Sequence, residues 1–194
     1  MIRAFIAVRI KPDMARKISE VQSELEQCLA GIRWVRKENL HLTIKFLGAI
    51  EEDKIMPIMG ALEEALRPIP RFSIVGRGIG VFPGIKRARV LWVGLEGEAL
   101  ISLAKAVEGV LEPIGFERER RAFSSHLTIG RWRDFETQSV RLKQEIERWK
   151  DHSFGESGVE EAVFFRSILK PQGAEYSPLG IIPLGNQPVS NRET

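Results

Sequence analysis

The sequence predicts an α+β fold built from two related halves, and three observations lead to this prediction. Segments typical of strands alternate with segments of helical periodicity. The order of these segments, a strand, a helix and then further strands, occurs twice along the 194 residues. The tetrapeptide His-Leu-Thr-Ile occurs once in each half, at His41–Ile44 and His126–Ile129. We place the boundary between the halves near residues 85–90 and expect strands to interleave across it, so that residues 1–194 form a single domain.

Eight segments have the β-branched and aromatic composition that favours strands. They cover residues 2–8, 32–35, 41–47, 71–81, 89–95, 123–132, 161–169 and 176–183. Glycines at positions 76, 78 and 80 lie inside the fourth segment. A nucleotide-binding glycine loop needs a helix directly after it, whereas Pro83 and a basic turn follow here. We therefore interpret these glycines as bends within a strand.

Four segments have the apolar periodicity of amphipathic helices. They begin near Pro12, Glu51, Glu98 and Thr137 and end near Leu29, Leu66, Leu111 and Trp149. In the first of them, Cys28 continues the apolar stripe, so we expect a buried small side chain and not a reactive thiol. Residues 185–194 are polar and are expected to form a loose tail.

The composition is that of a soluble globular protein, with 43% hydrophobic and 28% charged residues. The formal net charge of +3 is compatible with an anionic ligand but is too small to identify a nucleic-acid partner. A single cysteine excludes an intrachain disulfide and a thiolate zinc cluster. The apolar run Ala4–Val8 is too short for a signal peptide or a membrane span. The sequence therefore predicts a cytoplasmic protein without a membrane segment.

The repeated tetrapeptide is the strongest functional signal, because it uses two of the three histidines in the chain. Side chains alternate between the two faces of a strand, so the histidine and threonine point one way while the leucine and isoleucine point the other. The imidazole and the hydroxyl then lie about 6.6 Å apart along the strand, at ~3.3 Å per residue. Two such strands side by side would present two imidazoles and two hydroxyls to one ligand.

Such a set of groups suits the cleavage of a phosphodiester. One group must take a proton from the attacking oxygen, and another must give a proton to the leaving oxygen on the opposite side. Histidine can do either near neutral pH, with a reference pKa of about 6.5. Thr43, Thr128 and Arg131 would hold the non-bridging oxygens. A single His-x-Thr on a strand is usually structural, but two identical copies favour a catalytic pair of His41 and His126.

The paired motif resembles that of the 2H phosphoesterase superfamily. More narrowly, the chain resembles the bacterial and archaeal RNA 2',3'-cyclic phosphodiesterases, also known as 2'-5' RNA ligases. The resemblance extends over nearly the whole chain, through residues 3–7, 34–35, 39–48, 80–83, 90–93, 123–131, 167–169 and 173–176. One departure is Ser125, where proline often precedes the second histidine. This departure changes how the strand enters the site but removes no catalytic group.

This resemblance implies a bilobal α+β fold, in which two pseudo-symmetric lobes have antiparallel sheets lining a central groove and helices on the outside. It implies hydrolysis of RNA 2',3'-cyclic phosphodiester ends to 2'-phosphomonoesters, with no metal, ATP or other cofactor. The same site could join such an end to a 5'-hydroxyl in a 2'-5' linkage, as with tRNA halves. The implied roles are proton donor His41, proton acceptor His126, phosphate contacts Thr43, Thr128 and Arg131, and a base contact at Phe5.

Other charged side chains are interpreted separately. The basic turn of Lys86, Arg87 and Arg89 is expected to contact RNA phosphates. A second basic cluster within residues 118–121 is interrupted by a glutamate, and we interpret it as solvated surface. His152 is expected to be a solvated loop residue, and the spacing of the histidines does not favour a metal site.

Two rival functions stay open. The first is an RNA- or nucleotide-binding module that keeps the fold without turnover, although binding alone would not require two titrating histidines. The second is a metal-dependent phosphatase, which chelator-resistant activity would reject. For each of these functions we expect a monomer.

Overall fold

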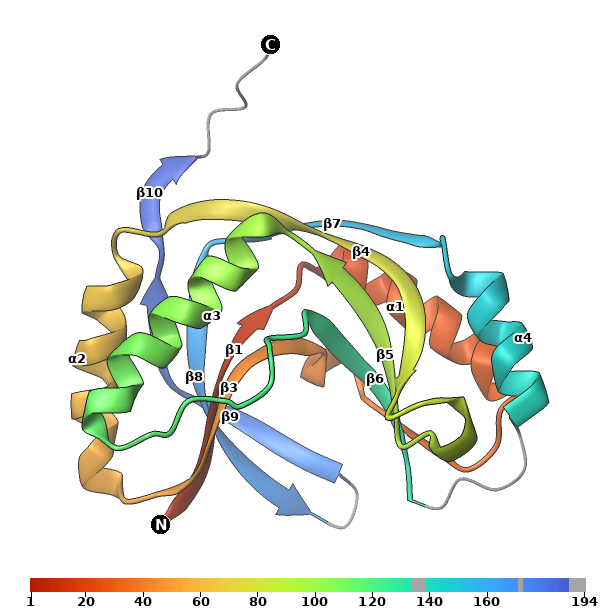
Figure 1. Ribbon diagram of the computed structural model, residues 1–194, viewed down its shortest axis with the longest axis horizontal. Coiled ribbons are helices and arrows are strands. Elements are labelled where there is room, and N and C mark those ends of the chain that lie inside the picture. Colours follow the sequence, from red (N-terminus) through yellow and green to blue (C-terminus); the bar gives the residue numbers. More distant parts are fainter. Residues whose placement is uncertain (134–138, 171–172, 189–194) are drawn as a thin grey trace.

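The computed structural model describes residues 1–133, 139–170 and 173–188, and their fold is α+β (Figure 1). The strands are β1 (Ile2–Arg9), β2 (Ile32–Trp34), β3 (His41–Ile50), β4 (Pro70–Phe82), β5 (Val90–Glu96), β6 (His126–Trp132), β7 (Ser153–Val159), β8 (Glu161–Lys170), β9 (Gly173–Pro183) and β10 (Gly185–Pro188). The α-helices are α1 (Pro12–Glu26), α2 (Ile55–Leu66), α3 (Glu98–Leu111) and α4 (Ser139–Trp149). No helix among the described residues is long and apolar enough to cross a membrane.

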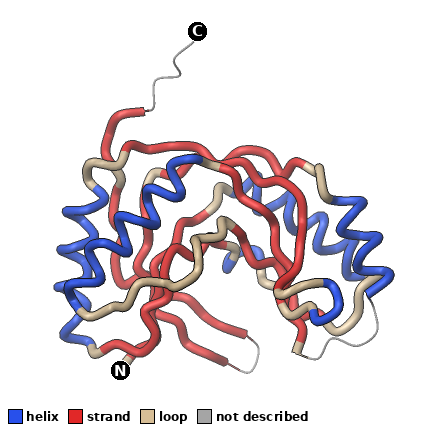
Figure 2. The backbone as a smooth tube through the Cα atoms, viewed as in Figure 1, coloured by secondary structure: helices blue, strands red, loops and turns tan. Residues whose placement is uncertain are grey.

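The strands form one curled sheet in the order β10-β4-β5-β6-β3-β1-β8-β9, with β2 added beside β6 and β7 beside β4. Neighbouring strands are antiparallel throughout the described residues, apart from the parallel pair of β10 and β4. The sheet bends into an arch, with α2 and α3 at one end and α1 and α4 at the other (Figures 1 and 2). The expected sheets of the two lobes are thus halves of one continuous sheet, joined through the pairing of β3 with β6.

The chain passes repeatedly between the two ends of the arch. α1 packs against β7 and α4 against β4, whereas α2 packs against α3 and β9. The short 3-10 helix at Ile85–Arg87 connects β4 to β5, which are neighbours in the sheet. Residues 85–90 therefore join two neighbouring strands of the sheet, and the expected boundary between interleaved lobes stays a prediction.

Two strands were not predicted from the sequence. β7 contains two glycines and a glutamate, which are rare in strands, although Phe154, Ser157 and Val159 are buried. Its pairing with β4 compensates for the low strand propensity of these residues. β10 forms at the start of the expected loose tail, where Gly185 pairs with Pro70, while residues 189–194 of that tail lie outside the described residues.

Two glycines of β4 are required by their surroundings, and the predicted bend is seen at Gly78. Gly78 lies at a register shift of the ladder with a φ of 65°, and a Cβ at this position would lie 2.4 Å from the carbonyl oxygen of Lys150. A Cβ on Gly80 would lie 2.2 Å from the ring of Trp92. Position 78 therefore requires glycine because the strand bends there, and position 80 requires glycine because the Trp92 ring occupies the space of a side chain.

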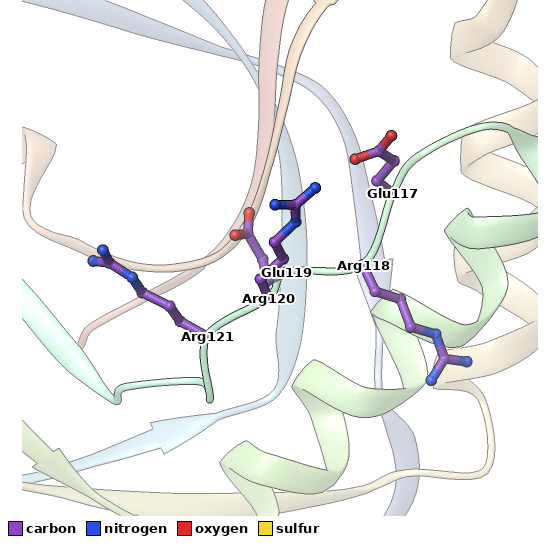
Figure 3. Close-up of a pocket in the computed structure, with 5 residues that line it drawn as sticks. All are labelled: Glu117, Arg118, Glu119, Arg120 and Arg121. Atoms are coloured by element: carbon purple, nitrogen blue, oxygen red, sulfur yellow. The ribbon is translucent and has the colours of Figure 1, made fainter.

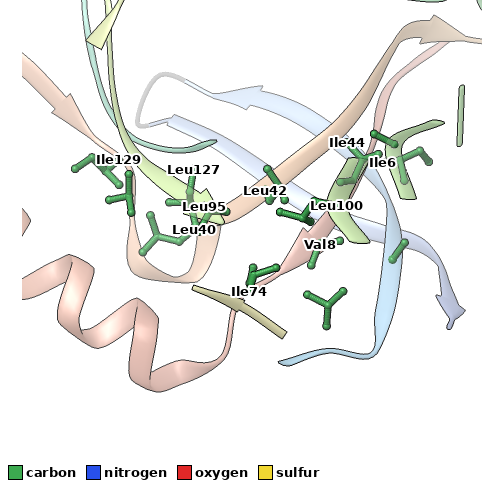
Figure 4. Close-up of a cluster of buried hydrophobic side chains, with 14 of the residues drawn as sticks. Ile6, Val8, Leu40, Leu42, Ile44, Ile74, Leu95, Leu100, Leu127 and Ile129 are labelled. Atoms are coloured by element: carbon green, nitrogen blue, oxygen red, sulfur yellow. The ribbon is translucent and has the colours of Figure 1, made fainter. Parts of the chain in front are cut away.

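One large apolar core lies between the sheet and the helices (Figure 4). It includes the leucines of both repeated tetrapeptides, Leu42 and Leu127, which have no exposed surface. Cys28 is partly buried against the same core. The apolar residues of the two motifs thus anchor β3 and β6, and their polar residues are left on the opposite face of the sheet.

Candidate active site

The two His-Leu-Thr-Ile copies lie side by side on β3 and β6. The strands are antiparallel and pair at Leu42 and Leu127. A register centred on this pair sets each histidine across from the threonine of the other copy. All four of these side chains are partly exposed, and they share one face of the sheet. The structure thus brings together the two imidazoles and two hydroxyls that the sequence predicted to share a ligand.

Both imidazoles are fixed by the same hydrogen bond to the backbone. The Nδ1 atom of His41 lies 2.7 Å from the carbonyl oxygen of Asn39, and the Nδ1 atom of His126 lies 2.8 Å from that of Ser124. A carbonyl oxygen only accepts, so Nδ1 carries a proton in each ring. The Nε2 atoms are therefore the ones available to exchange protons with a ligand.

His41 sits among aromatic rings. Phe5 stacks on it with a centroid distance of 5.0 Å, and Tyr176 meets it edge-on at 5.1 Å. Burial lowers the pKa of His41 to about 4, against the hydrogen bond to Asn39, and the charge of Arg131 adds to the lowering. The ring is therefore neutral in the free protein near neutral pH. Its Nε2 atom accepts a hydrogen bond of 3.1 Å from the hydroxyl of Thr43.

Phe5, the expected base contact, is buried beside His41. Only 3% of its surface is exposed, because it packs with Phe165 and Tyr176 in a small apolar cluster beneath His41. The ring therefore supports and desolvates the His41 imidazole, and its expected position near a bound RNA base stays a prediction.

His126 has fewer aromatic neighbours. Phe82 meets it edge-on at 5.0 Å, and Trp92 lies 5.3 Å from Phe82. Trp92 fits beside this pair because Gly80 leaves space for its ring. The result is a second aromatic wall, on the opposite side of the site from Phe5.

A β-bulge follows the threonine in both motifs. Ile44 in β3 and Ile129 in β6 are extra residues in their ladders, so the alternation of faces shifts after each of them. Simple alternation would place Arg131 on the face opposite to His126, whereas the bulge returns its exposed side chain to the histidine face. The bulge in β3 does the same for Phe46, which is opposite Phe5 and 63% exposed.

Lys45 is a buried charged residue that sequence reasoning missed. It is 3% exposed and forms an ion pair of 2.5 Å with Glu108 of α3. Its ammonium group also donates to the carbonyl oxygen of Glu117 at 2.7 Å, and Glu108 accepts from the backbone of Glu119 at 3.1 Å. This network ties the segment that leads into β6, and hence to His126, to the strand that carries His41. One sequence signal could have identified Lys45. It directly follows the repeated motif, on a face of the strand that is otherwise apolar.

The basic cluster at residues 118–121 lines a shallow hollow of about 460 Å³ (Figure 3). Arg118 is exposed and pairs with Glu112 at 2.8 Å, and Arg121 extends in the opposite direction (Figure 3). For the described residues, no ion pair holds Arg120 or Arg121 in place. These features agree with the interpretation of this cluster as solvated surface.

The remaining predicted residues lie away from the two histidines. Lys86, Arg87 and Arg89 are exposed on the turn between β4 and β5, next to the end of β6 that carries Arg131. His152 is not a solvated loop residue, because its ring packs between Trp149 and Phe154 at 4.7 and 4.9 Å. Within the described part of the chain, no group of three or more histidine, cysteine or acidic side chains is placed to hold a metal ion.

Known proteins share this sequence and this fold. Residues 8–92 match the model of a family described as LigT like Phosphoesterase. The RNA 2',3'-cyclic phosphodiesterase of Methanocaldococcus jannaschii is 35% identical over 90% of this chain and 96% of its own length. The protein of the same name from Archaeoglobus fulgidus is 33% identical over 93% and 99%.

Solved structures agree with these sequence matches. TT0787 of Thermus thermophilus superposes with a TM-score of 0.82 and 26% identity, over 95% of this chain and 99% of that one. Escherichia coli LigT, solved in complex with 3'-AMP, has a TM-score of 0.76 at 22% identity, over 94% of this chain and 98% of that one. The second match supports the fold alone, whereas the archaeal relatives support the family.

Proposed function

The chain belongs to the LigT-like 2H phosphoesterases, the family of the RNA 2',3'-cyclic phosphodiesterases, and we propose that it hydrolyses RNA 2',3'-cyclic phosphate ends to 2'-phosphomonoesters. The observation that carries this proposal is the pair of backbone-tethered imidazoles on facing strands. His126 takes a proton from water, and the water oxygen attacks the phosphorus. The bond to the 3' oxygen breaks, and His41 gives that oxygen a proton.

The low pKa of His41 has a consequence for its role as proton donor. A neutral imidazole cannot give a proton, so His41 must gain one when the substrate binds. The negative charge of the cyclic phosphate favours the imidazolium and raises the pKa of the ring. When its Nε2 atom becomes protonated, it no longer accepts from Thr43, and the hydroxyl is free to turn to the phosphate.

The phosphate would be held by groups on both strands. Thr43 and Thr128 lie beside the two imidazoles, and the bulge at Ile129 turns Arg131 to the same face. These donors compensate the charge that builds on the non-bridging oxygens during attack. The chemistry of this set needs no ATP, because the strained cyclic ester already stores the energy for its own opening.

The RNA base would stack on Phe46, not on Phe5. Phe46 is exposed, is on the histidine face, and lies 6.0 Å from Phe5. An exposed aromatic ring is a stacking surface for an unpaired base. The turn of Lys86, Arg87 and Arg89 would contact phosphates further along the RNA.

A related reaction would use the same groups. An RNA 5'-hydroxyl in place of water, deprotonated by His126, would attack the same phosphorus and form a 2'-5' linkage. Broken tRNA halves have suitable ends for this reaction. This reaction would also need no ATP, because the strained cyclic ester stores the energy for its own opening.

The site also has an approximate twofold arrangement. Outward from the centre, β3, β1, β8 and β9 on one side correspond to β6, β5, β4 and β7 on the other. Two helices cover each side (Figure 1). We infer two pseudo-symmetric lobes, with the histidine pair at the groove between them.

The test is to incubate the purified protein with an oligoribonucleotide ending in a 2',3'-cyclic phosphate, in the presence of EDTA, and to identify the product ends. A 2'-phosphate is expected, and the His41→Ala and His126→Ala variants should not form it. Binding without turnover would favour the RNA-binding module. Activity that EDTA abolishes and a divalent ion restores would favour a metal-dependent phosphatase.

A further inference from the structure

Arg33 is outside the set of residues that the proposed reaction uses. It lies on β2, and in the register of the sheet it is directly opposite Arg131 on β6. Both side chains are exposed. Residues directly opposite on antiparallel strands have Cβ atoms about 4.5–5.5 Å apart and project from the same face. Two arginines therefore stand side by side at this point of the sheet.

Arg33 and Arg131 project from the face of the sheet that carries the two histidines. The neighbours of Arg33, Ile32 and Trp34, point to the other face, where they close over Gly130. A Cβ on Gly130 would lie 2.6 Å from the Cγ2 atom of Ile32 and 3.3 Å from Trp34. Arg33 and Arg131 must therefore point into the groove.

Like charges placed directly opposite each other on a sheet are unfavourable unless something neutralises them. Among the described residues, no carboxylate forms an ion pair with Arg33 or Arg131. An anion from outside the chain can supply the missing charge, and a guanidinium pair matches the geometry of phosphate oxygens.

We propose that Arg33 binds the phosphodiester that precedes the cyclic phosphate in an RNA chain, which rests on the proposed function. A 2',3'-cyclic phosphate has one negative charge, which Arg131 and the imidazolium of His41 already balance. Arg33 adds further positive charge, which the phosphodiester before the cyclic phosphate would match. The exposed turn of Lys86, Arg87 and Arg89 adjoins the same end of β6, since Trp132 donates to the carbonyl oxygen of Arg89. Arg131 thus lies between Arg33 on one side of β6 and this turn on the other, so a row of basic residues crosses the end of the strand.

The test compares two dinucleotides that both end in a 2',3'-cyclic phosphate. One has an ordinary phosphodiester between its nucleosides, and the other has an uncharged methylphosphonate. Wild-type protein should have a kcat/KM about tenfold or more higher for the charged dinucleotide, as expected of a charge-assisted contact. Arg33→Gln should remove this preference, whereas Arg67→Gln, an exposed arginine at the end of α2, should retain it.

Equilibrium binding of the same dinucleotides to the His126→Ala variant, with and without Arg33→Gln, gives a readout that does not depend on turnover. The charged dinucleotide should lose affinity about tenfold with Arg33→Gln, and the salt dependence of its binding should become shallower. Equal losses on both dinucleotides would overturn the proposal, because Arg33 would then act on the cyclic phosphate itself. No loss on either dinucleotide would also overturn it. A wild-type protein that binds but cleaves neither dinucleotide would refute the proposed function and leave this binding test decisive for Arg33.

Discussion

His41 and His126 begin identical tetrapeptides on neighbouring strands, yet they have different surroundings. His41 lies over Phe5 and against Tyr176, and its pKa is lowered to about 4 by burial. In the described part of the chain, His126 has one aromatic neighbour, Phe82, at its edge. The backbone tether of Nδ1 is the same in both. The motif therefore sets the orientation of each imidazole, and residues from other strands set how far each ring is removed from solvent.

This difference bears on the two chemical roles that we propose. The His41 ring is neutral in the free protein and would become protonated when the anionic substrate binds. In the complex it would then carry the proton that the leaving oxygen needs. The more open ring can reach a water molecule, which suits the group that activates the nucleophile. The roles of His41 as proton donor and His126 as proton acceptor stay predictions, which kinetics of the two variants would test.

The largest expected effect comes from removing either imidazole. We expect His41→Ala and His126→Ala each to lower kcat on a 2',3'-cyclic phosphate oligonucleotide about 10²–10⁴-fold, because general acid–base steps have that magnitude. Steady-state kinetics with circular dichroism as a check of folding would measure this. If one variant kept near-normal turnover, the two copies would not form a pair.

A variant of His152, the third histidine, is the control for the two variants of the paired histidines. His152 packs between Trp149 and Phe154, so His152→Ala should lower the melting temperature without a comparable loss of kcat. A loss similar to those of the paired histidines would reopen a role for His152 in the reaction.

The next effect concerns stability in mild acid. An unfolded chain takes up a proton on His41 near pH 6.5, whereas the folded protein resists protonation until about pH 4. The contribution of the neutral ring to the free energy of unfolding is therefore complete above pH 6.5 and is lost as the pH falls toward 4, by up to ~1.4 kcal/mol per pH unit.

Urea unfolding at several pH values would measure this loss. His41→Gln cannot take up the proton, so the difference in unfolding free energy between wild type and this variant should shrink steadily below pH 6.5. A difference that does not change with pH would show that the pKa of His41 is not lowered.

A smaller effect is expected at the two threonines. The Thr43 hydroxyl is bonded to His41 in the free protein, so Thr43→Val should change both the phosphate contact and the pKa of the ring. Thr128→Val should affect the phosphate contact alone. Each should lower kcat/KM by about 10-fold, as expected for one hydrogen bond to a charged group. The pH–rate profile should move only for Thr43→Val, and a shift of equal size in both variants would contradict this asymmetry.

The sequence predicted much of this site because strand alternation is a short-range rule. The positions of the two histidines, two threonines and four apolar motif residues follow from it directly. The helices and most strands followed from periodicity in the same way. β7 was missed because its glycines and polar residues have little strand propensity, and only its pairing with β4 makes it a strand.

Features that depend on the register between strands could not be predicted. The bulge at Ile129 is what turns Arg131 to the histidines, and nothing in the local sequence indicates it. The contact of Phe5 with His41 depends on how β1 pairs with β3. Lys45 meets Glu108 through a helix 63 residues away in the chain. Each of these contacts is a long-range consequence of the fold.

The last prediction tests whether Phe5 makes the two histidines different. Phe5→Leu keeps an apolar side chain in the cluster but removes the ring stacked on His41. Less complete desolvation should let the pKa of His41 rise toward its ordinary value, while packing costs about 1 kcal/mol of stability. Phe82→Leu is the matched control, because it removes the aromatic neighbour of the other motif and should leave His41 unchanged. Titration of the imidazole resonances by NMR would follow His41 in both variants. An unchanged pKa in Phe5→Leu would mean that its low value is set by the rest of the pocket, with Phe165 and Tyr176 as the remaining rings around it.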